Sequence, residues 1–173
     1  MLLSRDYKYV ISLTYMARRI DPDAALPLHL LEPADPSLAI SFCDSPQDFQ
    51  DHWASVVSGF HGPEAALKMD PFKPMVENGV AIHYIAKLDG RSVGTATAID
   101  CAHGICAIFL VTVHPEARNK GIASKMLLQL LLDARKRGMK LAVLEATDMG
   151  RQVYLKLGFE DDVKVDLLAK EFH

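Results

Sequence analysis

The sequence predicts a single α/β domain with a mixed, mostly antiparallel sheet flanked by helices. Its 173 residues, half of them hydrophobic, suffice for one ordinary hydrophobic core. An Asp89-Gly90 turn between two strand-like runs indicates an antiparallel hairpin. A strand-helix-strand pattern over residues 104–147 indicates a right-handed crossover between parallel strands. Antiparallel and parallel neighbours are therefore expected in one sheet.

The first part of the chain is interpreted as an addition to the main domain. Residues 1–37 contain the strand-like run YKYVISLTYM, followed by four prolines that interrupt regular structure. We expect these residues to form an N-terminal extension wrapped on a domain that spans residues 38–173.

The main domain opens with a strand, LAISFC at 38–43, and an amphipathic helix at 45–60. Ser45 is the expected N-cap of this helix, and Pro46 occupies its first helical position. A second, short helix is expected within residues 63–79, where prolines interrupt the pattern.

The rest of the chain alternates strands and helices. The hairpin strands lead into GICAIFLVTV, an apolar, β-branched run typical of a strand buried on both faces. A leucine-rich helix follows, with Gly138 at its expected C′ position. The predicted elements are strands at 81–90, 91–100, 104–113 and 140–147, helices at 120–137 and 150–158, and one or two strands within 159–170.

Composition excludes several functional classes. A net charge of −3 gives no basic field for nucleic acid. Three cysteines (Cys43, Cys101 and Cys106) without paired spacing argue against a disulfide framework and against a metal site, and favour a reducing cytoplasm. No run approaches the ~18 apolar residues that a membrane span needs, so no membrane association is expected.

The loop before the leucine-rich helix is suited to binding an anion. The first turn of a helix has backbone N–H groups without partners and carries partial positive charge. Residues 117–140 hold seven cationic side chains against one acid, Asp133. A solvated basic helix face is the alternative explanation. The P-loop and dinucleotide-binding patterns are both absent, which argues against nucleoside triphosphates and nicotinamide cofactors.

Two sequence blocks resemble the GNAT superfamily, the Gcn5-related N-acetyltransferases. The pattern R-x-x-G-x-A at Arg118–Ala123 follows VTVHP directly and resembles the family's motif A. The block LEATDMGRQVYLKLGF at 144–159 resembles motif B, and both blocks stand in the family's order and spacing. The resemblance covers residues 38–170 and implies a sheet whose central parallel strands splay apart.

This resemblance implies acetyl-CoA as cosubstrate. A β-bulge within 108–113 and the splayed strands would leave a slot for the thioester, beside which backbone groups would pair with pantetheine. The helix-opening loop would hold the pyrophosphate. Thr147 stands where many members have asparagine. The residues implied in acetyl-CoA binding are Val111, Val113, Arg118, Asn119, Lys120, Gly121, Ile122, Ala123, Ser124, Thr147 and Gly150.

The resemblance also implies catalytic roles. Tyr154 matches a tyrosine that gives a proton to the leaving thiolate in many members. Many members carry a glutamate on the strand before motif A, but GICAIFLVTV contains no acid. Glu145 is the nearest candidate for the general base, and Asp100, His83 and His114 are further candidates, as is deprotonation through water. Cys106 is expected to be a buried structural thiol.

The implied activity is direct transfer of an acetyl group to a primary amine in a ternary complex. The acceptor is a small-molecule or protein amine that helices within 44–80 would select. Residues 20–77 contain ten acids and two bases, a net charge of −8, which would attract a cationic amine or else form a solvated acidic surface. The alternative function is a catalytically inactive CoA-binding or regulatory module. A homodimer is possible in either case.

Overall fold

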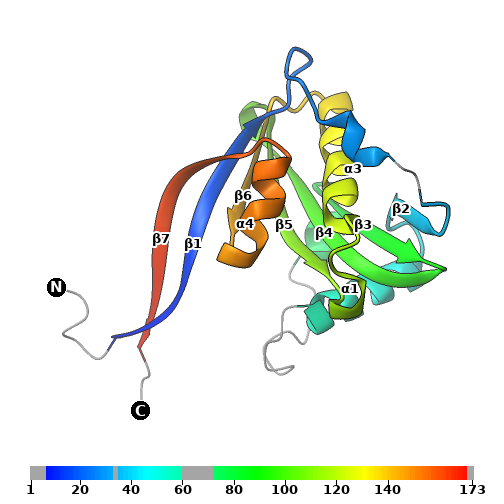
Figure 1. Cartoon of the computed structure of the whole chain (residues 1–173), viewed down its shortest axis with the longest axis horizontal. Helices are drawn as coiled ribbons and strands as arrows, with labels where there is room; N and C mark the ends of the chain where they lie inside the picture. The colour runs from blue at the N-terminus through cyan, green and yellow to red at the C-terminus, as the bar shows by residue number, and fades with distance from the viewer. Residues whose placement is uncertain (1–6, 33–34, 60–71, 171–173) are drawn as a thin grey trace.

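One seven-stranded sheet organises the molecule. A computed structural model describes residues 7–32, 35–59 and 72–170 (Figure 1). The strand order is β2-β3-β4-β5-β6-β1-β7, and only β5 and β6 run parallel. The strands are β1 (Tyr7–Arg19), β2 (Leu38–Phe42), β3 (Ala81–Leu88), β4 (Arg91–Cys101), β5 (Ile105–Val113), β6 (Leu141–Ala146) and β7 (Glu160–Lys170). The predicted mixed, mostly antiparallel sheet is confirmed.

Helices cover both faces of this sheet. The helices are α1 (Pro46–Gly59), α2 (Lys73–Glu77), α3 (Ile122–Lys136) and α4 (Asp148–Lys156). Helix α3 packs its leucines on one face of β3, β4 and β5, where they form the main hydrophobic core. Helix α1 lies on the other face, because His83 stacks on His52 of α1 while the next residue, Tyr84, belongs to the α3 core. Residues 63–71 of the expected second helix lie outside the described residues, and the described part of that segment forms α2 at Lys73–Glu77.

The N-terminal strand lies inside the sheet. Residues 7–19, which the sequence analysis assigned to an extension, form β1, with β6 on one side and β7 on the other. Both neighbours run antiparallel to β1. The backbone of this segment is therefore part of the same sheet as residues 38–170. The chain then crosses α3, where Arg135 donates hydrogen bonds to the carbonyl oxygens of Ile20 and Ala24 at 2.8 and 2.6 Å.

Two strands continue beyond the rest of the sheet. Strand β6 pairs with β1 only over Thr14–Arg19, whereas β7 pairs with β1 from Tyr7 to Ala17. Among the described residues, β7 is therefore the one strand that pairs with residues 7–13 of β1. Figure 1 shows this two-stranded arm, in blue and red, diverging from the body of the molecule.

The local signals predicted the hairpin and the helix ends correctly. Asp89 and Gly90 have φ values of +50° and +77°, as a tight hairpin turn requires. Ser45 caps α1 in a reciprocal arrangement, because its hydroxyl accepts from the Asp48 N–H at 3.1 Å while the Asp48 carboxylate accepts from the Ser45 N–H. Gly138 has φ +87° just after α3, which confirms the expected C′ position.

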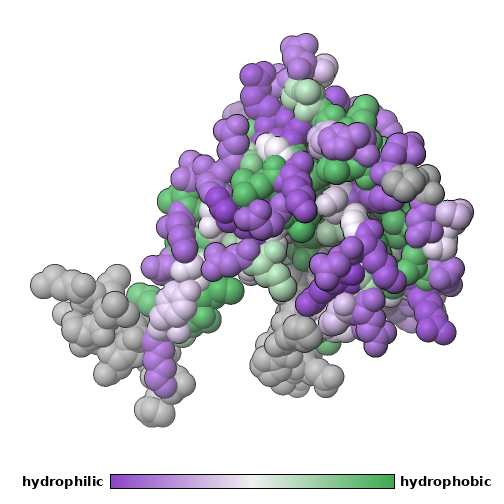
Figure 2. All heavy atoms as spheres, viewed as in Figure 1, coloured by the Kyte–Doolittle hydropathy of each residue, from purple (hydrophilic) through white to green (hydrophobic). Residues whose placement is uncertain are grey.

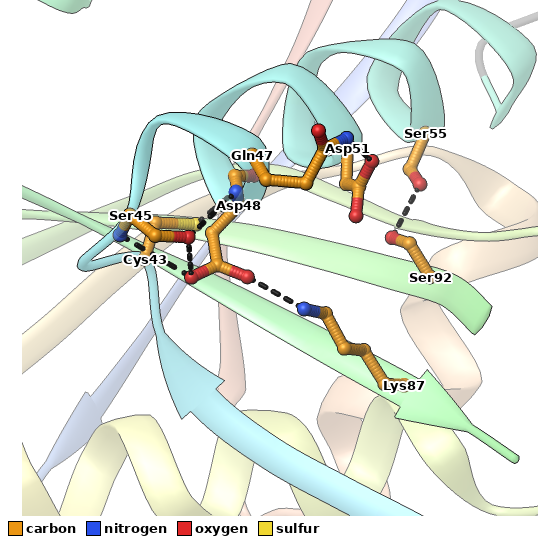
Figure 3. A network of polar contacts seen from close by, with 8 residues as sticks. All are labelled: Cys43, Ser45, Gln47, Asp48, Asp51, Ser55, Lys87 and Ser92. Carbon is orange, nitrogen blue, oxygen red and sulfur yellow. Dashed lines mark hydrogen bonds and ion pairs between the residues drawn. The ribbon is translucent and has the colours of Figure 1, made fainter. Parts of the chain in front are cut away.

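A polar network ties α1 to the β3–β4 hairpin (Figure 3). Lys87 Nζ lies 2.6 Å from Asp48 Oδ1 at the start of the helix. The hydroxyls of Ser55 and Ser92 lie 2.7 Å apart two turns later. The ion pair holds the pKa of the Asp48 carboxyl well below its usual range, because Lys87 and then Ser45 donate hydrogen bonds to the charged form. The position of α1 over the sheet is thereby fixed along its length.

In the described residues no helix is long and apolar enough to span a membrane. The same residues contain no cluster of histidine, cysteine and acidic side chains arranged to hold a metal ion.

Candidate functional site

Strand β5 carries a β-bulge near its carboxyl end. Thr97 of β4 pairs with Phe109 and Thr95 pairs with Thr112, so two residues of β5 stand opposite one residue of β4. Leu110, within the bulge, has φ +52°, and the Thr95 hydroxyl donates a hydrogen bond of 3.0 Å to its carbonyl oxygen. The bulge expected within residues 108–113 is confirmed.

Beyond the bulge, β5 and β6 separate. Their parallel pairing ends at Ile108 and Leu144, although β5 continues to Val113. The N–H of His114 donates to Val93 of β4, which turns the backbone groups of Val111 and Val113 toward the β6 side. The expected splay is confirmed, because these backbone groups face the side of β5 that β6 no longer pairs, a region here called the slot.

A loop of unusual backbone conformation lies between the end of β5 and the start of α3. Asn119 and Gly121 have φ values of +63° and +74°, and α3 begins directly after them. Alternating left-handed residues turn successive N–H groups toward one side and form an anion-binding concavity. A Cβ atom built on Gly121 would meet nothing within 4 Å, so the space in front of the loop is open. Arg118 lies on the slot side of β5, since its Nε donates to the Val113 carbonyl at 3.0 Å.

The other residues of the loop divide into exposed and inward positions. Lys120 is exposed at the tip, whereas Ile122 anchors the first turn of α3 in the core. Ala123 and Ser124 complete that turn and are half-buried. The backbone N–H groups of a first helical turn have no partners within the helix, so they are available to an anion at this position.

Three motif B residues meet at the start of α4. Thr147 is the N-cap of this helix, and its hydroxyl oxygen accepts from the Gly150 N–H at 3.3 Å. A Cβ atom on Gly150 would lie 3.2 Å from the Tyr154 ring, so glycine allows the ring to pack closely. Threonine at position 147 thus serves as the helix cap, one of the roles that asparagine can fill.

Tyr154 is held as a neutral phenol. It is 6% exposed and packs edge-to-face against Phe159, with ring centroids 6.0 Å apart. Burial raises the pKa of Tyr154 to about 12. The hydroxyl therefore keeps its proton through the neutral range and can donate it.

Glu145 lies on the opposite face of β6 from Tyr154. Leu144 and Ala146 point into the core that includes Tyr154, so Glu145, between them, points away. Its neighbour across the sheet is Tyr15 of β1. The pKa of Tyr15 is raised, chiefly because Glu145 accepts a hydrogen bond from its hydroxyl and also because the carboxylate charge opposes ionisation. The two predicted catalytic residues thus flank β6 from its two faces.

Of the remaining candidates for a base or nucleophile, three are hydrogen-bonded or buried within the fold. Asp100 accepts two hydrogen bonds, of 2.6 and 2.9 Å, from Arg137. His83 is buried under α1 and its Nδ1 lies 2.8 Å from the Thr97 hydroxyl. Burial raises the pKa of the Cys106 thiol to about 12, so little thiolate exists at neutral pH. His114 is half-buried directly after β5, beside the loop.

Sequence reasoning missed two groups on the α1 side of the slot. Tyr15 escaped notice because nothing local connects residue 15 with residue 145. Phe109, just before the bulge, is 37% exposed rather than buried, and its ring centroid lies 5.4 Å from that of Phe72 at the start of α2. The only signal in the sequence was an aromatic residue within an apolar strand. Such a residue can equally well belong to the core or to a site.

Comparisons with known proteins point to one family. The profile of the acetyltransferase (GNAT) domain matches residues 79–161, from the end of α2 to the start of β7. Among curated proteins, none matches this sequence.

Solved structures share the fold at low sequence identity. A GCN5-related N-acetyltransferase from Kribbella flavida has a TM-score of 0.70 at 17% identity over 99% of this chain and 63% of its own. Another from Sphaerobacter thermophilus has a TM-score of 0.72 at 18% identity over 96% and 53%. A predicted acetyltransferase from Clostridium acetobutylicum, solved with acetyl-CoA, has a TM-score of 0.56 at 21% identity over 72% and 91%.

This chain thus spans 63% and 53% of the length of the first two structures. The bulged strand, the splayed parallel pair and the loop at α3 all lie within the segment that matches the profile. Residues 79–161 therefore match a GNAT acetyltransferase domain, and the chain shares the fold of the GNAT structures.

Proposed function

We propose that this protein is an N-acetyltransferase that moves the acetyl group of acetyl-CoA directly to a primary amine. The observation that carries the proposal is the bulge at Leu110, because it coincides with the end of the β5–β6 pairing and stands next to an open anion-binding loop. An extended amide chain that ends in a pyrophosphate fits such a combination.

The donor side is built from backbone groups. Val111 and Val113 would pair with the pantetheine amides in the manner of an added strand. The N–H groups from Arg118 to Ser124 would hold the pyrophosphate at the positive end of α3. The Arg118 side chain braces the Val113 carbonyl and so acts on the loop's shape. When bound, acetyl-CoA supplies the activated acetyl group.

Tyr154 is proposed as the proton donor. In the reaction a C–N bond forms to the amine, the C–S bond breaks, and the thiolate that leaves takes up a proton. Tyr154 is a protonated phenol at neutral pH, and burial keeps it neutral by raising its pKa to about 12. Its ring is fixed by Gly150 and Phe159, so the direction of the hydroxyl is set before substrate arrives.

Glu145 is proposed as the base for the amine. An ammonium group has to lose a proton before its nitrogen can attack, and Glu145 lies on the face of β6 opposite Tyr154. Glu145 would therefore take a proton from the amine on one side of the slot, and Tyr154 would give a proton to the thiolate on the other. Tyr15 donates to the Glu145 carboxylate and orients it. A water molecule between Glu145 and the amine is consistent with this arrangement.

The acceptor is proposed to be a cationic amine with an apolar portion. Phe109 and Phe72 form an aromatic pair on the α1 side of β5. Two of the acids in residues 20–77 already form ion pairs, Asp48 with Lys87 and Asp21 with Arg19. The remaining acids still favour a positively charged substrate.

A catalytically inactive CoA-binding module is the second candidate. It is favoured by the absence of an acid on β5 and by the structural engagement of Asp100 and His83. An inactive module predicts binding of CoA without turnover.

Release of free thiol from acetyl-CoA, measured across a panel of amines, tests the proposal. Turnover with at least one amine, lost in Tyr154→Phe, supports catalysis. Thermal stabilisation by CoA with no turnover on any amine would support the catalytically inactive CoA-binding module instead. Absence of stabilisation by CoA or acetyl-CoA in large excess refutes both, because any ligand that binds only the folded state raises its stability.

A further inference from the structure

In the part of the chain that the structure describes, no strand pairs with the outer edge of β7. β7 is the last strand of the sheet and extends over eleven residues, from Glu160 to Lys170. An edge strand presents a row of N–H and C=O groups that can pair with another chain. Short edge strands limit this hazard, and β2 at the opposite edge has only five residues. β7 lacks that protection.

The arm that contains this edge is poorly supported by its own chain. Among the described residues, β7 is the one strand that pairs with residues 7–13 of β1, and a two-stranded ribbon is marginally stable alone. One of its faces is apolar, formed by Ile11, Leu13, Tyr15, Val163, Val165 and Leu167. Val163 and Leu167 are 50% and 44% exposed. Figure 2 shows hydrophobic atoms, in green, on this arm.

The other face of β7 carries alternating charges. Lys164 and Asp166 are both exposed, and Asp166 accepts a hydrogen bond from Ser12 of β1. The segment Val163–Leu167 thus reads apolar, basic, apolar, acidic, apolar. This short pattern is self-complementary when it meets its own reverse.

We propose that β7 pairs antiparallel with β7 of a second copy of this chain, around a two-fold axis at Val165. Val165 then faces Val165 of the second copy, and Val163 faces Leu167. Lys164 faces Asp166, and by symmetry the same contact occurs twice. A two-fold interface uses the same patch on both subunits, as this segment allows.

Neighbouring registers are less favourable. A centre at Lys164 places Asp162 opposite Asp166, and a centre at Val163 places Asp166 opposite Glu160. A centre at Asp166 places Lys164 opposite Leu168. Directly opposed like charges destabilise a strand pair, whereas opposite charges and apolar pairs stabilise it. The register centred on Val165 also places Asp162 opposite Leu168, but among these four it is the one with no directly opposed like charges and with Lys164 opposite Asp166.

Pairing in this register joins two arms into four strands. The backbone groups on the outer edge of β7 gain partners, and each arm becomes part of a sheet wide enough to be stable. The second copy of the chain also prevents the edge of β7 from pairing with strands of other proteins. The occupant of the edge is therefore a second molecule of the same protein.

The mass in solution is the first test. Sedimentation velocity or light scattering on the full chain should give a concentration-dependent species of about 38 kDa, twice 19.1 kDa. A monomer at every concentration up to the solubility limit would overturn the proposal.

Charge substitutions then test the register. Lys164→Glu places a carboxylate opposite Asp166, and Asp166→Lys places two lysines opposite each other, so each variant should weaken the dimer by about tenfold or more. Mixing the two variants should restore tight association, because both contacts are then complementary. Lys156→Glu, at an exposed position of α4, makes the same charge change away from β7 and should leave the dimer unchanged. A dimer insensitive to both β7 substitutions would place the interface elsewhere.

A crosslink provides an independent readout. Directly opposed residues of antiparallel strands have Cα atoms about 4.5–5.5 Å apart, within disulfide range. Val165→Cys in a Cys101→Ser background should therefore form a covalent dimer under mild oxidation. Lys156→Cys in the same background should not. Equal crosslinking of the two variants would show random collision and would refute the two-fold contact at residue 165.

Discussion

Tyr15 of β1 lies directly opposite Glu145 of β6, and this carboxylate raises the pKa of the Tyr15 phenol through hydrogen bonding and charge. The contact joins the beginning of the chain to one edge of the splayed slot. It raises the pKa of Tyr15, because ionisation of the phenol would lose that hydrogen bond and would oppose the carboxylate charge.

The first prediction concerns this pair. Glu145→Gln should lower the pKa of Tyr15 only part of the way toward its ordinary value, because the amide keeps the hydrogen bond and removes only the charge. Titration of the tyrosines by ultraviolet absorbance measures the change, with Tyr15→Phe to assign the signal. Glu145→Gln should also lower kcat with little effect on the thermal stabilisation by CoA. Unchanged kcat would remove Glu145 from the proposed mechanism.

Tyr154→Phe should lower kcat by about 100-fold or more, a typical effect of losing a general acid. CoA should still stabilise the variant, since only one oxygen atom is removed. Tyr84→Phe is the matched control, because Tyr84 is also buried and its pKa is likewise raised to about 12, but it contacts Asp133 of α3. Steady-state kinetics on both variants should separate them. Equal rates would leave Tyr154 as a packing residue.

Gly150→Ala should separate stability from activity. Alanine favours a helix interior by about 0.5–1 kcal/mol over glycine. The new methyl group would lie 3.2 Å from the Tyr154 ring, so the ring has to move. We expect a thermal midpoint close to that of the wild type together with a clear loss of kcat. Full activity would show that the position of the Tyr154 ring is not critical.

Gly121→Glu should abolish stabilisation by CoA, because it puts a negative charge where the loop would face the pyrophosphate. Gly90→Glu at the hairpin tip is a matched control, since Gly90 has a similar φ of +77° and also has nothing within 4 Å of a Cβ. Both variants carry the same backbone strain, of about 1–2 kcal/mol. Thermal shift assays with and without CoA compare them. Retained stabilisation in Gly121→Glu would contradict the assignment of the loop.

Acid should weaken the anchoring of α1. The folded-state pKa of Asp48 is depressed by Lys87 and Ser45, so its contribution to stability is present above the unfolded pKa of about 3.9 and is lost as pH falls below it. Asp48→Asn should be less stable than the wild type at neutral pH, with the difference shrinking toward pH ~3. Thermal midpoints across pH measure this. Ser45→Ala removes the cap and one hydrogen bond to the Asp48 carboxylate but keeps the Lys87 ion pair, so its loss of stability should depend less on pH.

Local features of the fold could be predicted from the sequence because their causes are local. The Asp89-Gly90 turn, the Ser45 cap and Gly138 each act within a few residues, so a single sequence suffices. The bulge and the splayed strands came from the family resemblance. No local pattern distinguishes Leu110, with its φ of +52°, from its apolar neighbours.

The place of β1 could not be predicted, because its partners are far away in sequence. Residues 7–19 have the composition of a strand, but their position depends on pairing with β6 and β7. For the same reason Tyr15 was absent from the predicted site. Phe109 was expected in the core because its strand is apolar, whereas the slot leaves it 37% exposed.

The interior position of β1 has a consequence for how the protein is made. Ser12 contacts Asp166 across 154 residues, so one of the first strands to leave the ribosome waits for the last strand of the sheet. Until then its apolar residues and both of its edges are open to other chains, and contacts so distant in sequence form slowly. We therefore expect nascent chains that stop before residue 160 to depend on chaperones.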